Sequence, residues 1–151
     1  MKKILMTAIT NSISEVMETM FFMPVETGPE TILNESGIDL NTALACRLNF
    51  TGDICGNIDL ISPAPLVAEL ASNFLGESKD ELTWEQQFGT LSEMLNMVCG
   101  NALKNVKCTS PFKIGIPGMI TGTDLNGCAK CTLVETMDSK MAILLSTSMS
   151  Q

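Results

Sequence analysis

Hydrophobic positions recur every three or four residues at the start of the chain and every second residue further on. The first pattern predicts an amphipathic helix over residues 3–20, with an apolar stripe of Leu5, Ile9, Ile13, Val16 and Met20. Residues 24–40 are rich in Gly, Pro, Thr, Asn and acidic side chains, a composition typical of a loop. Alternating apolar residues then predict a hairpin of two strands, 44–50 and 54–60, joined at Thr51-Gly52-Asp53.

Two further helices are predicted in the middle of the chain. Ser62 as N-cap and Pro63 at the first helical position start the shorter one, which ends at Gly76. Thr83 and Gln86 form a capping box at the start of a long helix. The apolar stripe of this long helix, which we expect to be buried, consists of Trp84, Phe88, Leu91, Leu95, Cys99, Ala102 and Val106.

The last part of the chain returns to strand periodicity. Strands are predicted over 112–120, 129–136 and 141–146, with a turn at Asn126-Gly127. We therefore expect an α+β fold in a single domain over residues 1–151, with the element order α-ββ-αα-βββ. Because hairpins dominate, the sheet should be mostly antiparallel, with the helices packed on one face. Pro117 cannot donate to a sheet ladder, so we expect it at an edge or a bulge.

Composition excludes several classes of function. The chain has no histidine and no tyrosine, which removes histidine acid–base catalysis, Ser-His-Asp and Cys-His nucleophiles, and zinc sites with imidazole ligands. Nine basic against seventeen acidic residues give a net charge of −8, and Arg47 is the single arginine, so we expect no nucleic-acid binding. No stretch approaches the roughly 18 apolar residues of a membrane span, and we expect a cytoplasmic protein.

The six cysteines are too sparse for a disulfide framework, and we expect reduced thiols. Cys128 and Cys131 form a C-x-x-C in a predicted strand, where residues three apart point to opposite faces and cannot share a metal. Cys46 and Cys99 lie on apolar stripes and are expected in the core. The sequence assigns no role to Cys55 or Cys108, and it predicts no metal site.

The face of the long helix opposite its apolar stripe carries Glu93, Asn96, Met97, Gly100 and Lys104. Glu93 and Asn96 are three residues apart, so their side chains point the same way. Glycine inside an exposed helix costs about 1 kcal/mol relative to alanine, which indicates that another backbone comes close at Gly100. Met94 and Met97 flank the pair, and methionine suits an adaptable contact surface. The spacing alone is more typical of an ordinary solvated helix face.

The helix over residues 92–102 reads SEMLNMVCGNA and resembles the Glu-x-x-Asn helix of the CheC/CheX/FliY response-regulator phosphatases. Residues 114–122, IGIPGMITG, resemble the proline-bearing strand of that family, and the first helix, the first hairpin and the helix after Pro63 fall where the family has them. CheC and FliY proteins carry two such helices; this chain has one, like the CheX type. The wider family motif often has Asp or Ser four residues before the Glu, where this chain has Gly89.

The resemblance implies an enzyme, a phosphatase that accelerates hydrolysis of the aspartyl phosphate of a CheY-like receiver in chemotaxis or another two-component pathway. Asn96 would orient the attacking water, Glu93 would pair with the receiver's active-site lysine, and Met97, Gly100 and Lys104 would contact the receiver. The chain would bind no cofactor, because the phosphorylated receiver brings its own Mg²⁺. Single-motif members of the family form homodimers. The alternative is a catalytically silent module that docks on a receiver or a flagellar switch component.

Overall fold

The computed structural model describes residues 2–107, 111–121 and 124–149. Its α-helices are α1 (Lys2–Met20), α2 (Ala64–Leu75) and α3 (Trp84–Lys104), and two short 3-10 turns are η1 (Leu33–Glu35) and η2 (Lys79–Glu81). The strands are β1 (Glu26–Ile32), β2 (Leu44–Thr51), β3 (Ile54–Ser62), β4 (Lys113–Ile114), β5 (Gly118–Ile120), β6 (Lys130–Glu135) and β7 (Lys140–Met149).

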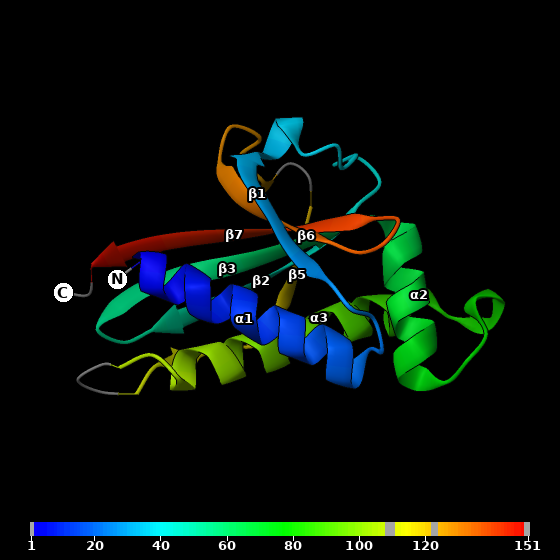
Figure 1. Cartoon of the computed structure of the whole chain (residues 1–151), viewed down its shortest axis with the longest axis horizontal. Helices are drawn as coiled ribbons and strands as arrows, with labels where there is room; N and C mark the ends of the chain where they lie inside the picture. Colours follow the sequence, from blue (N-terminus) through cyan, green and yellow to red (C-terminus); the bar gives the residue numbers. More distant parts are fainter. Residues whose placement is uncertain (1, 108–110, 122–123, 150–151) are drawn as a thin grey trace.

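The strands form one antiparallel sheet in the order β1-β6-β7-β3-β2-β4, and β5 also pairs with β2. Figure 1 shows α1 and α3 running side by side along the sheet, with α2 at one end. The apolar stripes of all three helices join one core cluster with residues of the sheet. The prediction of an α+β fold with an antiparallel sheet and helices on one face is therefore confirmed.

Both faces of the sheet are buried in its centre. Met141, Ile143 and Leu145 of β7 belong to the main core under the helices, whereas Ala142 and Leu144 belong to a second cluster on the other face. This second cluster is covered by η1 and the loop after it. The split follows from the two-residue period of a strand, which sends successive side chains to opposite faces.

The prediction of a loop over residues 24–40 is wrong in its first part. Glu26–Ile32 forms the edge strand β1, which pairs with β6, and the register shifts between Thr27 and Glu30. Gly28 and Pro29 lie in this irregular step, where a missing N–H donor is tolerated. An edge strand whose side chains are mostly exposed has no apolar alternation, so hydropathy does not reveal it.

The strand predicted over residues 112–120 is divided into β4 and β5, which both pair with β2. Pro117 lies between the two pieces, at the edge of the sheet, which confirms the prediction from its missing N–H group. Gly115 still donates its backbone N–H to the carbonyl oxygen of Asn49 at 2.8 Å. Ile116 projects into solvent with 92% of its surface exposed.

The predicted helix ends are partly right. The capping box of Thr83 and Gln86 is present, and Gly76 ends α2 in a left-handed conformation with φ 71°. Ser62, however, is the last residue of β3 and does not cap α2; the N-cap is Pro63. The Ser62 hydroxyl instead donates to the Pro63 carbonyl oxygen at 3.1 Å.

Two residues at helix ends were assigned to the wrong face. Met20 is 41% exposed and Trp84 is 48% exposed, although both continue the spacing of an apolar stripe. Each lies in the first or last turn of its helix. Helical periodicity shows which side of a helix is apolar, but not whether the sheet extends under the end of the helix. Met17 is the last buried residue of α1, and Trp84 stacks on Phe88 with their ring centroids 5.6 Å apart.

Candidate functional site

The helix α3 is held along its length by the core. Its buried residues are Thr90, Leu91, Met94, Leu95, Val98, Cys99, Ala102 and Leu103. It packs mainly against α1, α2 and β2, and these contacts fix its position (Figure 1). The capping box at Thr83 satisfies backbone donors at its first turn. The helix is therefore a rigid support for the side chains on its outer face.

A buried hydrogen-bond network ties α3 to α1. The Ser12 hydroxyl donates to the Val98 carbonyl oxygen at 2.9 Å, and the Asn101 side-chain amide donates to the Ser12 hydroxyl at 3.1 Å. Sequence reasoning missed this network. Its signal was a serine on the apolar face of the first helix, where Ser12 is 3% exposed between Ile9 and Ile13. The network fixes the register of the two helices and with it the outer face of α3.

That outer face presents Glu93 and Asn96 to solvent. Residues three apart on a helix have Cβ atoms about 5–6 Å apart, so the carboxylate and the carboxamide lie next to each other. Within the described residues neither side chain forms a hydrogen bond or an ion pair. Both are free to interact with another molecule. Lys104 is also exposed, at the end of the same face, and Met97 is half-buried.

Two glycines lie on this face beside the pair. A Cβ atom at Gly89 or at Gly100 would meet nothing within 4 Å, so packing within the chain does not require glycine at either position. Met94 was expected on this face but is fully buried. It is three residues after Leu91 and four before Val98, which places it on the buried stripe.

The buried cysteines Cys46, Cys99 and Cys131 contribute no reactive group to this face. Cys46 and Cys99 are in the core, as predicted, and burial raises the pKa of the Cys99 thiol to about 12 and that of Cys46 well above its ordinary value. Burial, and then the charge of Glu30, raise the pKa of Cys131. These thiols are neutral at neutral pH.

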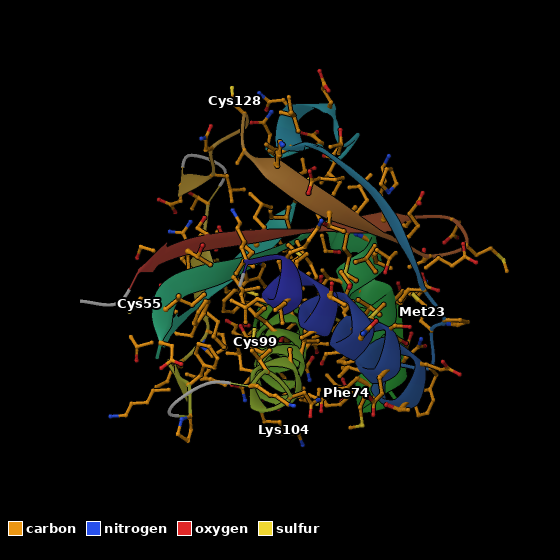
Figure 2. The ribbon with its side chains drawn as sticks, turned by 60° about the vertical axis from the view of Figure 1, so that its left-hand side comes forward. Met23, Cys55, Phe74, Cys99, Lys104 and Cys128 are labelled. Atoms are coloured by element: carbon orange, nitrogen blue, oxygen red, sulfur yellow. The ribbon has the colours of Figure 1, made fainter. Side chains whose placement is uncertain are left out.

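The C-x-x-C was placed wrongly. Cys128 lies in the turn before β6, not in a strand, and is exposed (Figure 2), whereas Cys131 is buried. Among the described residues no three His, Cys, Asp or Glu side chains are grouped to hold a metal ion. No helix in the described part of the chain is long and apolar enough to cross a membrane. Cys108 and Gly122 lie outside the described residues.

The arrangement suits catalysis by positioning. A carboxylate can pair with a cation, and a carboxamide can accept and donate a hydrogen bond at the same time. Placed side by side on a rigid helix, Glu93 and Asn96 can hold a partner group and a water molecule in a fixed relation.

Residues 44–136 match the family model described as chemotaxis phosphatase CheX, and this range is more than half of the 151 residues. The chain belongs to the CheX family.

Solved structures show the same fold. CheX from Vibrio vulnificus has a TM-score of 0.77 at 18% identity, over 95% of this chain and 99% of that chain. CheX in the CheX–CheY–BeF3–Mg²⁺ complex from Borrelia burgdorferi has a TM-score of 0.73 at 16% identity, over 94% and 96%. FliY from Thermotoga maritima has a TM-score of 0.58 at 17% identity, over 93% and 84%. No curated protein gives a significant match.

Proposed function

We propose that this protein is a cytoplasmic phosphatase that accelerates hydrolysis of the aspartyl phosphate of a CheY-like receiver. The observation that carries the proposal is the free Glu93/Asn96 pair on the outer face of α3 in a member of the CheX family. The complex of a B. burgdorferi relative with CheY supports the choice of partner. A module that only docks has no chemical need for a carboxamide at position 96.

The proposed chemistry requires little from the phosphatase. An acyl phosphate on an aspartate is already labile, and the receiver supplies the Mg²⁺ ion. Rate is then gained by placing a water molecule in line with the phosphorus–oxygen bond. Asn96 accepts one hydrogen bond from that water while it donates another, and Glu93 pairs with the receiver's lysine to hold the two proteins in register.

The first experiment follows the loss of phosphate from an autophosphorylated CheY-like receiver with Mg²⁺. Catalytic amounts of the protein should increase the rate of phosphate loss in proportion to their concentration. Binding of the phosphorylated receiver without any increase in rate would instead support the silent docking module.

We expect Gly100→Ala to stabilise the fold but to weaken docking of the receiver. Alanine at an open position inside α3 should stabilise the fold by up to about 1 kcal/mol in urea unfolding. We expect the same variant to lower kcat/KM about tenfold, because the methyl group lies where the receiver approaches and contacts of this kind cost 1–3 kcal/mol. The matched control is Gly89→Ala, where the space is equally open and the wider family motif often has Asp or Ser. Equal kinetic effects of the two changes would argue against docking at Gly100.

We also propose that a second copy of the chain covers the sheet edge formed by β4 and β5. Ile114, Ile116 and Met119 are 36%, 92% and 50% exposed there, and an edge strand offers unpaired backbone groups to another chain. Sedimentation should show a dimer that Ile116→Lys converts to a monomer. Met137→Lys, a change at a fully exposed methionine between β6 and β7, should leave the dimer intact.

A further inference from the structure

Four of the nine basic residues lie where α1 begins and α3 ends. They are Lys2 and Lys3 in α1, Lys104 in α3 and Lys107 after it, and all four are exposed. Figure 1 shows the start of α1 and the end of α3 at the same side of the molecule. We call this surface the basic end. It is unusual in a chain with a net charge of −8.

The fold does not explain these charges. Among the described residues the ion pairs are Arg47–Asp59 and Lys130–Glu30, so no lysine of the basic end is paired. Lys2 and Lys3 lie in the first turn of α1, where the helix dipole favours a negative side chain. Only Lys104, in the last turn of α3, has a favourable position relative to a helix dipole.

Two grooves of about 490 Å³ each lie at the basic end, and the second reaches the outer face of α3 at Gly100. Lys3 lines the groove between α1 and α3, and Lys104 and Lys107 line the groove between α3 and β4. Asn105 and Val106 line both grooves, and Gly100 lines the second. In the first groove Glu15 is the acidic residue, and the second has none. At about 1.5 Å per helical residue, Lys104 is about 12 Å along α3 from Asn96.

The other end of α3 has the opposite charge. Asp80 and Glu81 lie in η2 together with one lysine, Lys79, and Glu85 lies in the first turn of α3, so acidic residues outnumber basic ones there. The face of Glu93 and Asn96 therefore lies between an acidic end and a basic end. A field of this form attracts an anionic partner to one end and fixes which way round it binds.

We propose that the basic end is the docking surface for the negatively charged protein surface around the receiver's aspartyl phosphate. This inference rests on the proposed function and adds the means by which the substrate is oriented. A phosphoryl group carries close to two negative charges at neutral pH. The charge of the substrate is therefore opposite to that of the lysines at the basic end. The lysines steer and hold the receiver, while Asn96 and Glu93 act on the phosphorylated site.

The test compares two double variants with the same net charge. Lys3→Gln/Lys107→Gln removes two charges of the basic end, and Lys130→Gln/Lys140→Gln removes two charges of β6 and β7, away from both ends of α3. At about 20 mM salt we expect the first pair to lower kcat/KM about tenfold with kcat unchanged, and the second to have less than a twofold effect. At about 0.5 M salt the difference should disappear, because the charges are screened.

Three results would overturn the proposal. Equal effects of the two pairs would mean that net charge, not its location, matters. A lower kcat with unchanged KM would give the lysines a role in the chemistry and not in docking. Loss of a salt-sensitive dimer in sedimentation, with kcat/KM unchanged, would show that a second copy occupies the basic end. If the wild-type protein does not accelerate loss of phosphate from the receiver, the proposed function fails. The salt dependence of receiver binding to the two double variants then still tests the docking surface.

Discussion

Replacing Asn96 by alanine is expected to abolish most of the accelerated loss of phosphate, by about 10²-fold or more, without unfolding the protein. The side chain is exposed and has no partner among the described residues, so its removal breaks no contact within the chain. Alanine is also the best helix former, and α3 should be slightly more stable. The measurement is single-turnover loss of phosphate from the receiver at saturating phosphatase.

The matched control is Gln87→Ala. Gln87 carries the same amide on the same helix but is nine residues earlier, which places it on the opposite side of α3. This variant should keep its full rate. Binding of the phosphorylated receiver should survive Asn96→Ala within a few-fold, because Glu93 and the rest of the face remain. Unchanged acceleration by Asn96→Ala would remove the proposed role of the carboxamide, and loss of binding in step with rate would make Asn96 a docking residue.

The sequence predicted α3 well because two independent signals coincide there. A capping box at Thr83 marks its start, and apolar residues repeat at helical spacing over many turns, with Glu93 and Asn96 on the polar side. Because the apolar period repeats over many turns of this long helix, the exposure of both residues could be predicted from their spacing. Met94 was misplaced because its contribution was judged by residue type, although its spacing already assigned it to the core.

Features that depend on distant parts of the chain were not predictable. The edge strand β1 exists because β6 offers it a ladder, and its own sequence, with Gly28 and Pro29, favours a turn. The Ser12–Asn101 hydrogen bond joins residues 89 positions apart, so no local pattern contains it. The basic end likewise becomes visible only when α1 and α3 are placed side by side.

The largest stability effect is expected from Arg47→Met, which should lower the free energy of unfolding by about 2–3 kcal/mol. Arg47 and Asp59 face each other in register on β2 and β3, with Nε–Oδ1 at 2.7 Å and Nη2–Oδ2 at 2.9 Å. The Asp59 side chain is only 5% exposed, whereas that of Arg47 is 32% exposed. The hydrogen bond to Asp59 raises the pKa of the Arg47 guanidinium, so the guanidinium stays charged.

The reason for this loss is the carboxylate that Arg47→Met leaves behind. Breaking a fully buried pair costs about 3–5 kcal/mol, and the partial exposure of Arg47 places the expected value below that range. The double variant Arg47→Met/Asp59→Leu removes both charges and should recover most of the stability. Urea unfolding at constant m value measures both variants. A double variant no more stable than Arg47→Met would show that the loss comes from packing of the arginine stem and not from the unpaired charge of Asp59.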